Sequence, residues 1–157
     1  MLLTGLLPDI STDPAIETAT DSIEAGRSGT IVAPVGIRPP LLAAAASRAA
    51  RPLVVLTATG RDAETLTNAL ASWIPGVAML PAWETLPHER LSPQVDTMAR
   101  RIAVLRRLVH PIAGDDSAGP LSILVVPIRA FLQPIIAGLA DLEPVRVRTG
   151  DVLDLTE

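Results

Sequence analysis

The chain has 157 residues, a formal net charge of −4 and no lysine, cysteine or tyrosine, so all 13 of its strongly basic residues are arginines. This inventory excludes Schiff-base chemistry, thiolate metal sites and disulfides. The acidic balance disfavours a strong non-specific grip on DNA or on an anionic membrane. No apolar run approaches the roughly 20 residues that a membrane span needs, so we expect a soluble, cytoplasmic protein of one domain or of one domain plus part of a second.

The hydrophobic pattern alternates between helical and extended segments. In chain order it predicts a helix over 11–25, a strand over 30–35, a helix over 41–50, a strand over 53–57, a helix over 59–73, a strand over 77–80, a helix over 93–109, a strand over 121–126, a helix over 129–139 and a strand over 145–148. Most of these strands are continuous apolar runs, which are typical of a parallel sheet covered on both faces. The predicted fold class is therefore α/β, with an open, mostly parallel sheet flanked by helices.

Two of the helices carry more detailed expectations. The first helix is expected to be capped by Ser11 or Thr12, just ahead of Pro14. The longest helix has an apolar stripe that is predicted to face the core. The members of this stripe are Val95, Met98, Ile102, Leu105 and Val109.

The segment after the first predicted strand stands where a nucleotide-binding loop would lie. A functional phosphate loop reads G-x-x-x-x-G-K-[ST], with backbone N–H groups around the phosphates, a lysine and a hydroxyl that holds magnesium. Here Ala33 occupies the first glycine position, Arg38 the second, Pro39 the lysine position and Pro40 the hydroxyl position, while Gly36 fits the loop interior. Each proline also removes a backbone N–H donor. We interpret the loop as degenerate, with anion binding through Arg38 as the alternative to a plain proline-rich helix start.

A proline-rich stretch before the longest helix contains short chemical patterns. His88 and Glu89 begin an H-E-x-x-H pattern, but Ser92 stands at its fifth position and the prolines are incompatible with the helix that such a zinc site needs. A nucleophile–base pair of Ser92 and His88 lacks an orienting acid. The favoured interpretation is an ordered loop that Trp83 and Leu86 anchor against the sheet.

The same stretch also carries a longer signature, W-E-x-x-P-x-x-x-x-S-P. It is formed by Trp83, Glu84, Pro87, Ser92 and Pro93, with Leu86 inside it. Together with the helix over 100–108, the upstream run 53–61 and the downstream run 143–151, this signature resembles the N-terminal region of the bacterial transcription-repair coupling factors (Mfd). The resemblance covers residues 30–157.

The resemblance implies a RecA-like domain, similar to domain 1a of the excision-repair helicase subunit UvrB, whose phosphate loop has decayed. It implies a non-catalytic scaffold module that recruits UvrA through an inserted domain and contacts other domains of the parent protein. ATP and magnesium, RNA polymerase and DNA are bound in such proteins by parts far downstream. We therefore expect no cofactor, no metal and no catalytic residue in this chain.

The resemblance to this family divides the chain into three parts. Residues 1–29 form an N-terminal helical segment, residues 30–142 the degenerate RecA-like domain, and residues 143–157 the incomplete start of the inserted, UvrA-binding domain. Most of the inserted domain would follow Glu157. No UvrA-contacting residue is therefore assigned, and we expect the sequence to be a fragment of a longer protein.

Six arginines are candidates for contact with a partner or with another domain of the parent. They are Arg100, Arg101, Arg106 and Arg107 on the longest helix, and Arg146 and Arg148 on the last predicted strand. The simpler interpretation is a solvated surface, in which Asp96 supports the helix by pairing with Arg100 four residues later.

Two other functions remain open at this stage. A nucleotide-binding enzyme domain with an unorthodox phosphate loop would bind ATP through the strand, loop and helix over 32–44. DNA binding through the arginine-bearing helix would weaken steeply with salt. The net negative charge favours negligible binding to duplex DNA.

Overall fold

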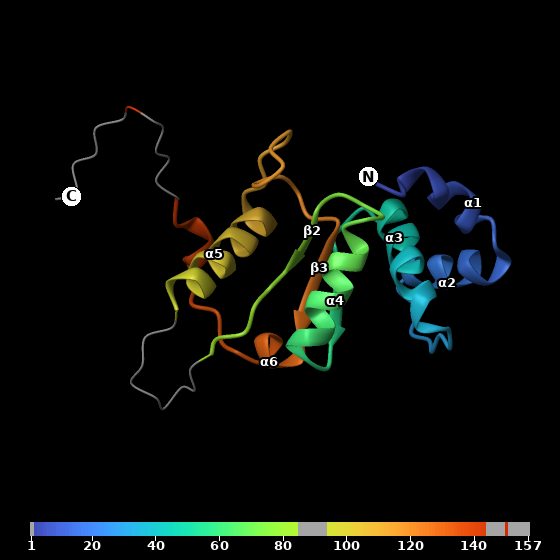
Figure 1. The fold of residues 1–157 in the computed structure, drawn as a ribbon, viewed down its shortest axis with the longest axis horizontal. Coiled ribbons are helices and arrows are strands. Elements are labelled where there is room, and N and C mark those ends of the chain that lie inside the picture. The colour runs from blue at the N-terminus through green and yellow to red at the C-terminus, as the bar shows by residue number, and fades with distance from the viewer. Residues whose placement is uncertain (1, 85–93, 144–149, 151–157) are drawn as a thin grey trace.

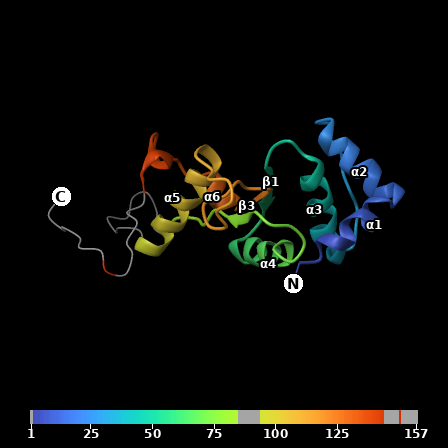
Figure 2. The same ribbon diagram turned by 90° about the horizontal axis from the view of Figure 1, so that it is seen from above.

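The computed structural model describes residues 2–84, 94–143 and 150. Its α-helices are α1 (Leu7–Ser11), α2 (Pro14–Glu24), α3 (Arg38–Arg48), α4 (Gly60–Leu70), α5 (Val95–Val109) and α6 (Ile128–Phe131), and its strands are β1 (Leu53–Thr57), β2 (Val77–Met79) and β3 (Ile123–Pro127). Helices α1–α3 lie at one end of the molecule and α5 at the other, with the sheet and α4 between them (Figures 1 and 2).

The three strands form one parallel sheet in the order β1-β3-β2. β3 is the central strand, and Val125 pairs with Val55 of β1 on one side and with Met79 of β2 on the other. The predicted α/β class with a parallel sheet is confirmed. Its RecA-like character stays a prediction.

Helices cover both faces of β3. Ile123 and Val125 point to one face, where they pack with Ala43 of α3 and Ala63 of α4. The alternate residues of β3 point to the other face, where they pack with Val104 of α5 and Ala130 of α6. The continuous apolar sequence of this strand is thus explained by burial on both faces, as predicted.

β1 departs from the prediction because it is buried on one face alone. Leu53 and Val55 pack against the cluster that contains α3 and α4, whereas Val54 is 56% exposed and Leu56 47% exposed. The cluster on the second face contains Val104 of α5 with residues of β2 and β3 but none of β1, so among the described residues this face of β1 stays about half exposed. An apolar run alone does not distinguish such an edge strand from a central one.

The strand predicted over 30–35 is wrong. Residues 30–34 have no regular structure, Val32 is 95% exposed, and a 3-10 turn at Val35–Ile37 leads directly into α3. α3 begins at Arg38, three residues before the predicted start at 41, with Pro39 and Pro40 in its first turn. Proline is well suited to that turn because its fixed φ is helical and its missing N–H would be unpaired there. These prolines extend the helix into the segment that the pattern assigned to a loop.

The N-terminal segment contains two helices where one was predicted over 11–25. Asp13 caps α2, because its Oδ1 accepts hydrogen bonds from the backbone N–H groups of Ala15 at 2.8 Å and Ile16 at 3.3 Å. The expectation of Ser11 or Thr12 as the cap is wrong. Both α1 and α2 contact α3.

α4 matches its prediction at the start, with Thr59 as a cap that accepts a hydrogen bond from the N–H of Asp62 at 3.1 Å. α6 is much shorter than predicted and is followed by turns and a 3-10 turn at Leu139–Asp141. The strand predicted over 145–148 lies outside the described residues. So does the predicted start of an inserted domain over 143–157, except for residues 143 and 150.

No described helix combines the length and the apolar character that crossing a membrane requires.

The predicted core stripe of α5 is rotated. Of the predicted members, Leu105 is buried and Ile102 half-buried, whereas Val95, Met98 and Val109 are exposed. The other buried residues of this helix are Thr97, Arg101 and Val104. A polar residue and a charged residue thus take the places that the hydrophobic pattern gave to aliphatic ones. Their partners belong to the candidate site.

Candidate functional site

The signature residues Trp83 and Glu84 lie at the carboxyl edge of the parallel sheet. β2 ends at Met79, and the N–H of Leu80 still donates to the carbonyl of Val125 at 3.0 Å. α6 begins directly after β3, so the chain after β2 and the helix after β3 leave the sheet at the same edge. This edge is where parallel α/β sheets usually carry their functional sites.

The backbone of Trp83 is fixed by a side-chain amide. Its N–H donates to Oε1 of Gln133 at 2.7 Å, and Nε2 of Gln133 donates to the Trp83 carbonyl at 3.2 Å. Nη2 of Arg129 donates to the neighbouring carbonyl of Glu84 at 3.2 Å. α6 and the residues after it therefore hold the signature segment from one side.

Arg101 holds the same segment from α5. Its guanidinium carbon lies 4.4 Å from the centroid of the Trp83 ring, a cation–π arrangement. Its Nη1 donates to the carbonyl of Pro81 at 2.6 Å. The side chain is 0% exposed, and burial lowers the pKa of the guanidinium, which remains charged at neutral pH. Arg101 is therefore not part of a solvated helix surface, contrary to the expectation from sequence.

Glu84 places a carboxylate at the N-terminus of α5. The hydroxyl of Thr97 donates to Glu84 Oε1, and Gln94, the N-cap residue, makes no side-chain cap bond of its own. The Thr97 hydroxyl, and after it backbone N–H groups, lower the pKa of Glu84 below its ordinary value. The positive end of the helix dipole favours the same ionised state.

The other signature residues, Leu86, Pro87, Ser92 and Pro93, lie outside the described residues, as do His88 and Glu89. The prediction that Leu86 anchors a loop is therefore untested. For Trp83 the structure gives a half-buried ring covered by Arg101.

The segment predicted to be a degenerate phosphate loop leads into α3 through a 3-10 turn. No strand precedes it among the described residues, so Ala33 does not stand at a sheet edge. Gly36 lies in a 3-10 turn, Arg38 is exposed, and Pro39 and Pro40 lie within the first turn of α3. The two prolines present no N–H donors to a phosphate at that turn.

The remaining candidate arginines differ in their exposure and in the groups that they bond to. Arg100 is largely exposed and pairs with Asp96 at 2.8 Å. Arg106 is mostly covered, with its guanidinium 3.2 Å from both the Leu142 carbonyl and the Glu143 carboxylate.

Arg107 is also engaged within the chain. Its Nε donates to the Gly119 carbonyl at 2.8 Å, and burial lowers its pKa while Asp115 opposes that shift. Arg146 and Arg148 lie outside the described residues. Of the helix arginines, Arg100 is thus the one most available to a partner.

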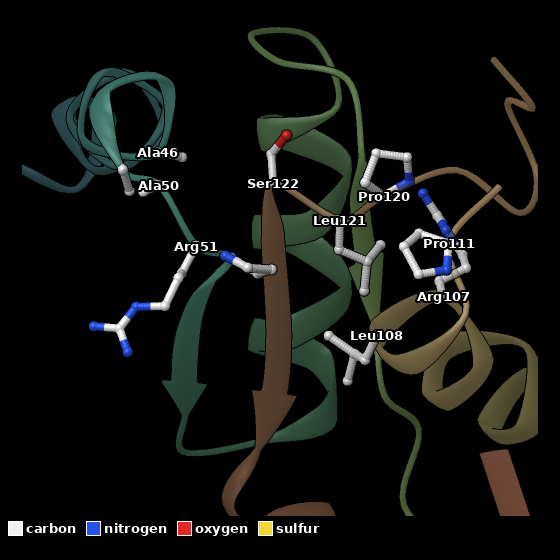
Figure 3. Close-up of a pocket in the computed structure, with 11 residues that line it drawn as sticks. Ala46, Ala50, Arg51, Arg107, Leu108, Pro111, Pro120, Leu121 and Ser122 are labelled. Atoms are coloured by element: carbon white, nitrogen blue, oxygen red, sulfur yellow. The ribbon is translucent and has the colours of Figure 1, made fainter. Parts of the chain in front are cut away.

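A small cavity of about 290 Å³ lies at the opposite, amino end of the strands (Figure 3). Alanines and prolines make up much of its wall, and Arg51 points away from Leu108 and Leu121 in the close-up. The residues that line it include no carboxylate or imidazole that could act as an acid or base. In the described ranges no cluster of three or more His, Asp or Glu side chains is arranged to hold a metal ion.

Three residues of the signature site, Thr97, Arg129 and Gln133, were not found from sequence, and Arg101 was found only as a possible partner contact. Thr97 and Arg101 are four residues apart on α5 and share a face, which is a detectable spacing, but the aliphatic stripe beside them gave a stronger signal. Gln133 and Arg129 come from a region 45 to 50 residues away in sequence from Trp83 and Glu84, and no local pattern marks them.

The fold and the site define a class of protein: a small parallel α/β chain whose signature segment is held by structural contacts at the carboxyl edge of its sheet. No family model matches the chain. It is 46% identical over 125 residues to the transcription-repair-coupling factors of Mycobacterium bovis and Mycobacterium tuberculosis. The predicted resemblance to transcription-repair coupling factors is confirmed.

The match includes most of this chain but only a small part of each relative. It covers 78% of the chain and 10% of each relative. The chain thus spans about a tenth of the length of these two proteins.

Proposed function

We propose that the chain is a non-catalytic scaffold module of a transcription-repair coupling factor, the kind of protein that links a stalled RNA polymerase to nucleotide excision repair. The observation that carries this proposal is the 46% identity to the two mycobacterial coupling factors. In this proposal the module supports recruitment of UvrA, while ATP hydrolysis, RNA polymerase binding and DNA translocation belong to other parts of the parent. Its location is then cytoplasmic.

The absence of catalysis in this module is supported by the loop after residue 30. Proline stands at the lysine and hydroxyl positions of a phosphate loop, and both prolines are built into α3. A nucleotide phosphate would meet neither a lysine nor a row of free N–H groups there. The carboxyl edge of the sheet is instead crossed by the Trp83 segment, which α5 and α6 hold in place.

A scaffold role fits the contacts of the signature segment. Glu84 contacts two different helices, because its carboxylate accepts from Thr97 of α5 and its backbone carbonyl accepts from Arg129 of α6. The Trp83 ring lies against Arg101 of α5. Such a junction fixes the direction in which the chain leaves the sheet. It also helps to hold α5 against this edge of the sheet.

The recruitment role is tested by capture on immobilised UvrA of a complete coupling factor that contains this chain. We expect retention of the complete protein, and weaker retention of a Trp83→Ala variant that still unfolds cooperatively. Absence of any complex between UvrA and the complete protein would remove the proposal.

The alternative, a nucleotide-binding enzyme domain, is tested on the chain itself. A fluorescent ATP analogue is titrated with magnesium present, and wild type is compared with an Arg38→Ala variant. We expect no saturable binding to either protein. Saturable micromolar binding that the Arg38 variant loses would establish the alternative instead.

A further inference from the structure

α2 lies on the outer side of α3, away from the sheet (Figures 1 and 2). Its main contacts are with α3 and α1. Its buried aliphatic residues Ile16 and Ala19 pack with two residues of α3, Leu41 and Ala44, in a small cluster that is separate from the two clusters on the sheet. α1 differs, since its Leu7 belongs to a cluster on the sheet. α2 is therefore held mainly through α3, and it contributes no residue to the core of the sheet.

The chain that joins α2 to α3 is irregular and exposed. Residues 27–34 have no regular structure, and residues 25–32 are exposed. Among the described residues the backbone of 28–33 makes no hydrogen bond. Such a connection leaves α2 free to move away from α3 without breaking backbone pairing elsewhere in the fold.

One arginine of α3 joins the two helices through polar contacts. Nη2 of Arg48 lies 2.6 Å from Oδ1 of Asp21 and 2.8 Å from Oε2 of Glu24. Its Nη1 donates to the hydroxyl of Thr20 at 2.9 Å. Both carboxylates stand in the last turn of α2, where the negative end of the helix dipole opposes them, and α2 contains no basic residue. Arg48 therefore compensates a charge pattern that is unfavourable in α2 alone.

We propose that α2 is a salt-sensitive latch, which opens from α3 as one unit while α3 and the sheet stay folded. A helix of 11 residues is marginal by itself in water, so α2 melts as it leaves α3. The ion pairs of Arg48 set the opening equilibrium, and salt screens them because the three side chains are between 39% and 52% exposed. Opening exposes Leu41 and Ala44 of α3. The latch gives the module a second state, a property beyond its proposed scaffold role.

Native-state hydrogen exchange of the whole chain, resolved by NMR, tests the latch. The backbone amides of Ala19, Thr20 and Ile23 should share one opening constant, at least about tenfold larger than that of Val125 in β3. Sodium chloride raised from about 10 mM to about 1 M shortens the Debye length from roughly 30 Å to 3 Å, and should increase the α2 opening constant about threefold or more. An α2 opening constant equal to that of Val125 would overturn the proposal, and so would protection that falls off gradually toward the end of α2, which is the pattern of fraying.

Arg48→Gln removes the ion pairs and should increase the α2 opening constant about fivefold, with the exchange of Val125 unchanged and the response to salt lost. Arg51→Gln is the matched control, because it removes the same charge from an exposed arginine that makes no bond to α2 among the described residues. Exchange in α2 should match wild type in that variant. Equal effects of the two variants on α2, or an equal acceleration of α2 and Val125 by Arg48→Gln, would overturn the proposal.

A form of α2 without the two carboxylates separates the ion pairs from the packing of Arg48. In an Asp21→Asn, Glu24→Gln background, Arg48→Gln should change the α2 opening constant about twofold or less, because the interaction that it removes is already absent. The same fivefold effect in both backgrounds would mean that Arg48 acts through packing, and the ionic latch would then be wrong.

Discussion

The guanidinium carbon of Arg101 and the centroid of the Trp83 ring are 4.4 Å apart, and this contact joins the segment after β2 to the second turn of α5. Both residues depend on the pair, because Trp83 covers a buried charge and Arg101 covers an aromatic ring. The same arginine also bonds to the Pro81 carbonyl. α5 is therefore attached to the sheet partly by a polar junction.

Trp83→Ala is expected to lower the free energy of unfolding by roughly 2–4 kcal/mol, because it removes a large ring and uncovers the buried guanidinium of Arg101. Trp83→Phe keeps a ring and should cost about half as much. Urea denaturation followed by circular dichroism measures both variants through the midpoint at constant m-value.

Phe131→Ala is the control for the loss of an aromatic ring. Phe131 is 57% exposed, so its removal should change the free energy of unfolding by about 0.5 kcal/mol or less. An equal effect of Trp83→Ala and Phe131→Ala would show that the Arg101 contact does not stabilise the fold.

Glu84→Gln is expected to change how stability depends on pH. The pKa of Glu84 is lowered in the folded protein below its ordinary value of about 4.5, first by the Thr97 hydroxyl. The stabilisation is therefore fully present above pH 4.5 and is lost as the pH falls through the lower, folded pKa. The difference between wild type and Glu84→Gln should be largest at neutral pH and should shrink in acid.

Urea midpoints measured at a series of pH values check this. Thr97→Val keeps the shape of the side chain and removes the hydroxyl donor, so it should weaken the same pH dependence. A constant difference between wild type and Glu84→Gln from neutral pH to strongly acid pH would contradict the assignment.

The sheet could be predicted from the sequence wherever burial on both faces left an unbroken apolar run. β3 is such a strand, and its neighbours β1 and β2 also lie within one to two residues of their predicted ends. The run at 30–35 has the same apolar pattern but forms no strand, since pairing depends on a neighbour that is distant in sequence. Burial on one face of β1 was likewise invisible to the pattern.

The sequence predicted two residues of the candidate site but none of the contacts that they make. Trp83 and Glu84 stood out through the signature, but their partners lie 13 to 50 residues away, and none of these pairings has a local periodicity. Arg101 shows the limit most clearly. A charged residue at a buried helix position contradicts the hydrophobic pattern, and a carbonyl together with an aromatic ring, both from another element, explains it.

The α2 cap gives a separate prediction. Asp13→Ala removes the acceptor of two backbone N–H groups and should lower the free energy of unfolding by about 1 kcal/mol. Thr12→Ala changes the adjacent exposed residue, whose hydroxyl bonds only to the Asp9 carbonyl, and should cost about 0.5 kcal/mol or less. Thermal unfolding monitored at 222 nm, a helix wavelength, compares the two. A larger loss for Thr12→Ala would return the cap to the position that the sequence favoured.

Two valines in paired strands test the difference between the centre and the edge of the sheet. Val125→Ala removes buried methyl groups from β3 and should lower the free energy of unfolding by about 2 kcal/mol, because the residue is 0% exposed and packed on both neighbours. Val54→Ala makes the same chemical change on the open face of β1, where the side chain is 56% exposed, and should cost about 0.5 kcal/mol or less. Urea denaturation measures both variants in this chain. Repeating Val54→Ala in a complete coupling factor extends the test, since a cost that rises toward that of Val125→Ala would mean that another part of the parent covers β1.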